Sequence, residues 1–161
     1  MKNKLISLLR SNARLSASDL AIELNVTENE VISAISEMEK AGVIRGYTAI
    51  VTDQAPGSES RVKALIEVKV TPNRDGGFDR VARRIAKFPE VTDLFLLSGN
   101  YDLLLTVEGN SLQQVASFVS DKLATIDGVI STATAFQLKK YKESGRIMQS
   151  DEEYERLKIC F

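Results

Sequence analysis

The sequence of 161 residues contains no histidine, no tryptophan and a single cysteine, Cys160. Histidine is the commonest general base in enzymes and the commonest transition-metal ligand, so its absence removes both roles at once. One cysteine forms neither an internal disulfide nor a thiolate metal site, and it suits a reducing compartment. We therefore expect a protein that is not an enzyme and that holds no metal or cofactor.

Long apolar runs and an excess of one charge are also missing. No run approaches the ~18 apolar residues that span a bilayer, and no signal-peptide pattern opens the chain, so a cytoplasmic protein without membrane contact is expected. The 21 Lys and Arg residues nearly balance the 22 Asp and Glu residues. This balance lacks the basic excess typical of nucleic-acid-binding domains. With 43% hydrophobic and 27% charged residues, the composition is that of an ordinary globular protein.

Before Gly42, apolar residues recur at helical spacing in three short segments. The first covers 2–11, the second follows Ser16, and the third follows Thr27. Ser16 and Thr27 each have an acidic residue three positions later, which predicts a capping box at both helix starts. Two residues, 25–26, separate the second and third helices, as in a helix-turn-helix whose third helix is the recognition helix.

Gly42 suits the position after the end of the third helix, where φ is positive. The β-branched segment 43–51 then predicts a strand or wing, and the composition of 53–60 predicts a linker.

The period changes after the linker. Strands are expected at 62–70, 91–97, 101–108 and 129–138, with helices starting near Phe78 and after Ser111. Gly99 and Asn100 are interpreted as a two-residue hairpin turn. The resulting order, β-α-β-β-α-β, is that of a ferredoxin-like domain. Both helices would cover one face of the sheet, so the apolar opposite face predicts self-association.

These expectations define an α+β chain with an N-terminal winged helix-turn-helix domain (1–52), a linker (53–60) and a C-terminal ferredoxin-like βαββαβ domain (61–139). A charged extension (140–161) follows, with a short helix expected at 151–157.

Four motifs, at 8–16, 19–21, 42–49 and 98–109, resemble the leucine-responsive and asparagine-operon regulator family (Lrp/AsnC, the feast/famine proteins). The resemblance implies DNA binding by the first domain. It also implies dimers through the ferredoxin-like sheets, higher homo-oligomers, and an amino acid or related effector bound between these domains.

The resemblance places the effector pocket at the Gly-x-Tyr-Asp segment, that is, at Gly99, Tyr101 and Asp102 with Ser98 and Asn100 beside them. A positive φ at Gly99 would expose backbone N–H groups to a carboxylate, and Asp102 would hold an ammonium group. A plain hairpin turn explains the same residues. Thr132 and Thr134 are further candidates, although β-propensity alone accounts for them.

The recognition helix is unusually acidic, with four glutamates between Thr27 and Lys40. Carboxylates contribute nothing to the counterion release that drives DNA binding. At the outward positions, Asn29 suits adenine, Glu28 suits cytosine and Ile32 suits a thymine methyl. The expected DNA-binding residues are Glu28, Asn29, Ile32, Ser33 and Ser36 for bases, and Arg14, Ser16, Ser18 and Arg45 for phosphates.

We therefore expect a DNA-binding transcription regulator modulated by a small effector, with double-stranded DNA, an amino acid and copies of itself as partners. One alternative is an effector-binding oligomer that no longer contacts DNA and acts on a protein partner. Another is an enzyme resembling the haem-pathway decarboxylases, with Arg80, Arg83 and Arg84 holding substrate carboxylates. The missing histidines count against this enzyme, and the helical spacing of the arginines fits a solvated face.

Overall fold

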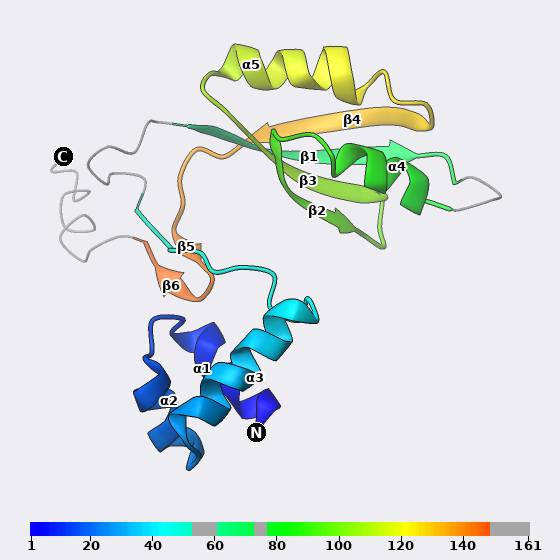
Figure 1. Cartoon of the computed structure of the whole chain (residues 1–161). Coiled ribbons are helices and arrows are strands. Elements are labelled where there is room, and N and C mark those ends of the chain that lie inside the picture. Colours follow the sequence, from blue (N-terminus) through cyan, green and yellow to red (C-terminus); the bar gives the residue numbers. More distant parts are fainter. Residues whose placement is uncertain (53–60, 73–76, 149–161) are drawn as a thin grey trace, which may run out of the picture. The chain divides into compact units, whose positions relative to one another are not determined.

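The computed structural model describes residues 1–52, 61–72 and 77–148, and the chain divides into two compact units (Figure 1). The first unit is Met1–Ile50 and the second is Val51–Phe161. The expected linker, the helix expected at 151–157 and Cys160 lie outside the described residues.

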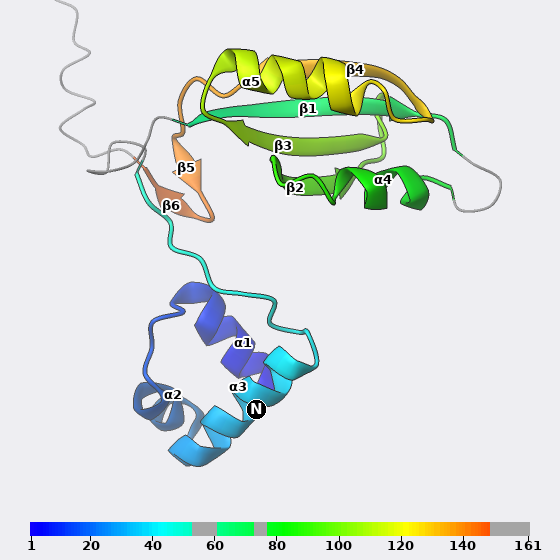
Figure 2. The same ribbon diagram turned by 45° about the horizontal axis from the view of Figure 1, so that its top comes forward.

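Three helices form the first unit: α1 (Lys2–Ser11), α2 (Ala17–Leu24) and α3 (Glu28–Lys40) (Figure 2). Both predicted capping boxes are present, because Ser16 and Thr27 each exchange hydrogen bonds with the acidic residue three positions later. Asn25 adopts a left-handed conformation, with φ 53°, and so turns the chain sharply from α2 into α3. The core of this unit consists of Leu5, Leu20, Ala21, Val31, Ala34 and Met38.

Gly42 follows α3 with φ +68°, as expected for a residue just beyond a helix end. The strand expected at 43–51 is not formed. A strand requires a hydrogen-bonded neighbour, and none of the strands in the described part of the chain pairs with this segment. The β-branched composition of this segment was therefore not sufficient to predict a strand.

The second unit contains a four-stranded antiparallel sheet with the strand order β2-β3-β1-β4. Its elements are β1 (Val62–Val70), α4 (Asp79–Ile85), β2 (Val91–Leu96), β3 (Leu103–Gly109), α5 (Leu112–Ser117) and β4 (Val129–Phe136). The predicted βαββαβ order is therefore confirmed. A short hairpin follows, β5 (Lys142–Glu143) with β6 (Arg146–Ile147), in a region where the sequence predicted no β-structure.

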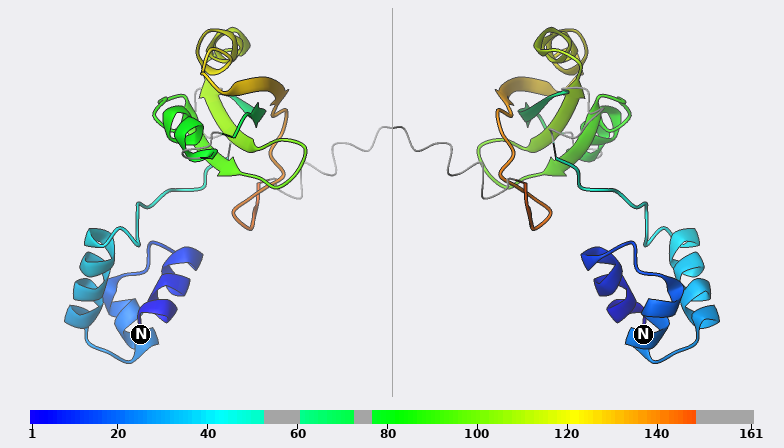
Figure 3. Two further views of the ribbon diagram at one scale, coloured as in Figure 1. Left: turned by 90° about the vertical axis from the view of Figure 1, so that its right-hand side faces the viewer. Right: turned by 90° about the vertical axis from the view of Figure 1, so that its left-hand side faces the viewer.

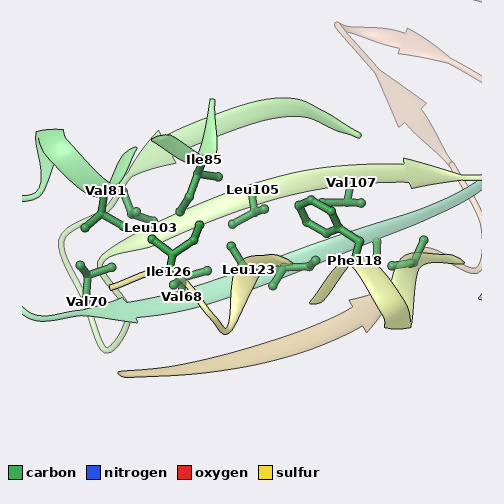
Figure 4. Packing of buried hydrophobic residues seen from close by; sticks show 13 residues of the cluster. Val68, Val70, Val81, Ile85, Leu103, Leu105, Val107, Phe118, Leu123 and Ile126 are labelled. Atoms are coloured by element: carbon green, nitrogen blue, oxygen red, sulfur yellow. The ribbon is translucent and has the colours of Figure 1, made fainter. Parts of the chain in front are cut away.

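Both helices pack on one face of this sheet (Figure 3). Alternate residues of β1, namely Ala64, Ile66, Val68 and Val70, are buried beneath them, as the alternating pattern predicts. Figure 4 shows the contributions of α4, β3 and the segment after α5 to the same core. None of the described helices covers the opposite face of the sheet, which exposes Leu65, Phe95 and Leu97.

The helix after Ser111 changes its winding. Beyond α5 it continues as a π-helix, η1 (Phe118–Leu123). Val115, Phe118 and Leu123 are buried against the sheet, whereas Leu112 and Ala116 are exposed. Phe118 and Leu123, five positions apart, both reach the core because the π-helical winding between them is wider than an α-helical turn.

The turn between β2 and β3 is also longer than predicted. Strand pairing continues beyond Leu96 and Leu103, because the Leu97 N–H donates to the Asp102 carbonyl at 2.8 Å. Four residues, 98–101, therefore form the loop instead of the two predicted. Gly99 is not among the glycines with positive φ, since the longer loop reverses the chain without a left-handed residue there.

Candidate nucleic-acid interface and effector site

The outward face of α3 carries the residues expected to contact bases. Glu28, Asn29, Ile32 and Ser33 are exposed, and Ser36 is half-buried. Ile32 is 54% exposed, so its side chain is available for contact with an apolar group such as a thymine methyl. Asn29 and Ser33 also line a shallow hollow of about 290 Å³ beside the start of α1.

Three of the four glutamates of α3 have partners within the first unit. Glu30 caps the helix by accepting from the Thr27 N–H at 2.8 Å, and Glu37 accepts from Lys2 Nζ at the same distance. Glu39 accepts from the Tyr47 hydroxyl at 3.0 Å.

These contacts favour the charged form of two of the carboxylates. Hydrogen bonds from the Thr27 N–H and hydroxyl lower the pKa of Glu30, and the Lys2 ammonium lowers that of Glu37. The pKa of Tyr47 is raised, by burial first and then by its hydrogen bond to Glu39. The acidity of the recognition helix is thus largely accounted for by local structure.

The four residues expected to contact phosphates are all exposed, but they differ in the contacts that they already make within the first unit. The Ser16 hydroxyl donates to Asp19 Oδ2 at 2.6 Å within the capping box, so its proton is already engaged. The Arg14 N–H donates to Asn12 Oδ1 at 3.0 Å, which fixes the loop before α2. The Arg45 guanidinium lies over Gly42, where a Cβ would be 2.9 Å from Cζ.

Asp102 is the best-anchored of the residues expected to bind an effector. Its Oδ2 atom accepts from the Val70 N–H at 2.8 Å, and its own N–H donates to the Val68 carbonyl at 3.1 Å. Its side chain is only 16% exposed. The carboxylate therefore supports the sheet as well as presenting a charge.

Lys69 lies beside this carboxylate, with 3.7 Å between its Nζ and Asp102 Oδ1. The same Nζ donates a hydrogen bond to the Asn100 carbonyl at 3.0 Å. Lys69 was not among the residues predicted from the sequence to bind an effector. Lys69 alternates with the buried residues of β1, as Lys63 and Glu67 also do, so the sequence shows only that it points outward. Its closeness to Asp102 depends on the register between β1 and β3. The exposed residues Ser98, Gly99 and Asn100 and the half-buried Tyr101 complete the loop beside this pair.

Thr132 and Thr134 lie on the other face of the sheet. They pair with Val68 and Ile66, whose side chains point into the core, whereas Lys69 points to the opposite face. Paired residues of antiparallel strands share a face, so one chain does not bring these threonines next to Asp102.

Two negative findings apply to the described residues. No group of histidine, cysteine, aspartate and glutamate side chains there could hold a metal ion. None of the helices is long and apolar enough to cross a membrane.

Comparison with known proteins agrees with these two units. Residues 2–45 match a winged helix-turn-helix DNA-binding model, and residues 63–147 match the Lrp/AsnC ligand binding domain. The fold and its matches define a DNA-binding regulator with a small-ligand domain.

The chain belongs to the Lrp/AsnC family of helix-turn-helix transcription regulators, which are not enzymes. It is 40% identical over 158 residues to YugG, an uncharacterised HTH-type transcriptional regulator of Bacillus subtilis, covering 98% of this chain and 95% of that protein. The predicted family, fold class and non-enzymatic role are thus confirmed.

Solved structures show the same architecture. The transcriptional regulator NMB0573 of Neisseria meningitidis, in complex with L-Met, is 26% identical with a TM-score of 0.68 and covers 88% of this chain and 90% of its own. AsnC of E. coli is 22% identical with a TM-score of 0.64, covering 88% and 93%. The likeness to AsnC supports the fold alone.

Proposed function

We propose that this regulator senses an amino acid bound beside the loop 98–101, and that binding changes its assembly or its affinity for DNA. The observation that carries the proposal is the pair formed by Lys69 and Asp102, with 3.7 Å between Nζ and Oδ1. A free α-amino acid has one carboxylate and one ammonium group, and this pair offers a partner for each. The L-Met complex of the Neisseria regulator, a protein of the same fold, supports the choice of an amino acid.

The assembly is proposed to form through the open face of the sheet. Leu65, Phe95 and Leu97 are 42%, 54% and 40% exposed there, and apolar side chains gathered on one sheet face favour self-association. Because Thr132 and Thr134 lie on the other face, they contact a ligand at Asp102 only when they come from another copy of the chain. An effector that prefers one assembly shifts the population toward it.

The DNA contacts are proposed to come from the outward face of α3. Bases would be contacted by Glu28, Asn29, Ile32, Ser33 and Ser36. Phosphates would be contacted by Arg14, Ser16, Ser18 and Arg45. The acidic helix also supports the second candidate, an oligomer that no longer binds DNA. The partners found for Glu30, Glu37 and Glu39 weaken that candidate, because these charges serve the domain itself.

The test has two parts. The first measures the thermal midpoint of the full chain with each of the twenty amino acids, since a ligand at 100 times its Kd adds about 2.7 kcal/mol. The second measures binding to genomic DNA fragments between low and high salt, with and without the amino acid that stabilises the protein. An amino acid that stabilises the protein and alters its salt-dependent DNA binding supports the proposal. Absence of DNA binding at low salt supports the second candidate, and no stabilising amino acid refutes the proposed effector class.

A further inference from the structure

Four cations form a surface on α4 that the proposed function leaves unused: Arg80, Arg83, Arg84 and Lys87. The inner side of α4 carries Val81 and Ile85 into the core (Figure 4), so the cations point away from the sheet. They line an open hollow of about 690 Å³. We refer to them as the α4 basic surface.

Two aspartates partly neutralise this surface. Asp127 Oδ2 lies 3.1 Å from Arg80 Nη2, and Asp79 Oδ2 lies 3.6 Å from Arg83 Nη2. All four of these side chains are between 65% and 84% exposed. Exposed ion pairs of this kind contribute little and exchange partners readily. Arg84 and Lys87 leave the surface with a net charge of +2.

We propose that the α4 basic surface binds the phosphate backbone of the DNA held by the helix-turn-helix unit. This inference rests on the proposed DNA binding and adds a second contact region to it. The first unit has six acidic and six basic residues within 1–47, so it supplies little of the counterion release that gives affinity for DNA. The α4 basic surface would supply, from the second unit, the positive charge that the first unit lacks for binding DNA.

The spacing of the cations suits a row of phosphates. Arg80, Arg83 and Arg84 lie on one side of α4, and Lys87 follows in the turn closed by its N–H bond to the Arg84 carbonyl. At a rise of about 1.5 Å per residue, this row extends about 10 Å. Each DNA strand presents a phosphate roughly every 3.4 Å of helix axis and winds around that axis, so successive phosphates lie farther apart than this rise, and a row of this length suits about two phosphates of one strand.

The shape of the hollow favours a backbone over a small ligand. Pockets for small molecules bury most of the ligand and are lined mainly by apolar groups. Here six of the eight described lining residues are charged, and the side chains of Arg80 and Arg83 remain mostly in solvent. Flexible, exposed cations are typical of contacts with phosphates, which position a protein on DNA without reading its sequence.

The test compares full-length variants in their affinity for double-stranded DNA across a range of salt. Arg84→Gln with Lys87→Gln removes two cations that have no ion pair among the described contacts. Lys139→Gln with Lys142→Gln is the matched control, because it changes the net charge equally and lies near the β5–β6 hairpin, at the other end of the sheet (Figure 1). Thermal midpoints of both variants confirm that each is folded.

The α4 variant should bind every DNA sequence more weakly, and the slope of log affinity against log salt should fall by about 0.9 for each lost phosphate contact. The control should keep the wild-type slope, and Arg84→Lys should keep most of it. An unchanged slope in the α4 variant overturns the inference, while salt-dependent binding by the wild type leaves the proposed function intact.

Two further outcomes also decide the question. Inorganic pyrophosphate could stabilise the wild type but not the α4 variant, while both proteins bind DNA equally well. This result makes the hollow a small-anion site and overturns the inference. Absence of DNA binding by the wild type overturns both the inference and the proposed DNA-binding function.

Discussion

The Asp102 carboxylate accepts a hydrogen bond from the Val70 N–H, with 2.8 Å between Oδ2 and N, where the register between β1 and β4 shifts. The same carboxylate faces Lys69 through its other oxygen. One side chain therefore holds an irregular point of the sheet and presents a charge beside an exposed loop. Substitutions at this position must separate these two roles.

Asp102→Asn should abolish or weaken the response to an amino acid effector by about tenfold or more, because it removes the charge that binds an ammonium group. It should leave stability nearly unchanged, since the amide oxygen still accepts from the Val70 N–H. Asp102→Ala should lose the response and also destabilise the second unit by about 1–3 kcal/mol, through the unsatisfied N–H. Effector titration followed by thermal midpoint measures both effects. An effector response that survives Asp102→Asn unaltered contradicts the proposed site.

Gly42→Ala should destabilise the first unit by at least about 1 kcal/mol. An alanine is strained at φ +68°, and its Cβ would lie 2.9 Å from Arg45 Cζ. Gly46→Ala is the control, because no atom lies within 4 Å of a Cβ there and its φ is not positive. Denaturant unfolding followed by circular dichroism compares the two. Equal effects would show that the helix end does not depend on the left-handed residue.

Asn29→Ala and Arg14→Gln should weaken DNA binding in different ways. Loss of a base contact costs about 1–3 kcal/mol on the preferred sequence and leaves the salt slope unchanged. Loss of a phosphate contact weakens binding to all sequences and lowers the slope by about 0.9. Binding measured on a preferred and a scrambled duplex at several salt concentrations distinguishes the two. A uniform effect of Asn29→Ala on both duplexes would exclude a role in reading bases.

Acid should destabilise the second unit partly through Glu90. The Lys122 ammonium, which donates to Glu90 and lies about 6 Å from the Phe118 ring, holds the pKa of Glu90 below its ordinary value. A carboxyl whose pKa is lower in the folded state contributes stability above the unfolded pKa, about 4.3, and loses it as the pH falls through the folded pKa.

Glu90→Gln should therefore flatten the dependence of unfolding free energy on pH below about 4.3, with an effect of about 1 kcal/mol at neutral pH. Urea unfolding at several pH values measures it. Lys122→Gln should flatten the profile similarly, and the double variant should add little to either change. Fully additive effects would show that the two residues act separately.

Local signals in the sequence were enough to predict the helices of the first unit. Ser16 and Thr27 form capping boxes with neighbours three residues away, and Gly42 ends α3 through its own backbone. The alternation in β1 likewise predicted its buried face. These features depend on residues close together in the chain, where spacing determines geometry.

Features that depend on pairing between distant strands were not predictable in this way. The four-residue loop 98–101 follows from the register of β2 against β3, and the contact between Lys69 and Asp102 follows from the placement of β3 beside β1. The segment 43–51 has the composition of a strand but no neighbour among the described strands. Sequence spacing carries no information about these partners.

The π-helix η1 has a consequence for the length of the chain. The buried side chains of Phe118 and Leu123 are five positions apart, where one α-helical turn spans three or four. A chain one residue shorter between them would return to α-helical winding and still direct both side chains to the core. A relative with one residue fewer at 119–122 is therefore expected to keep the same fold, and superposition of such a structure on this one would check it.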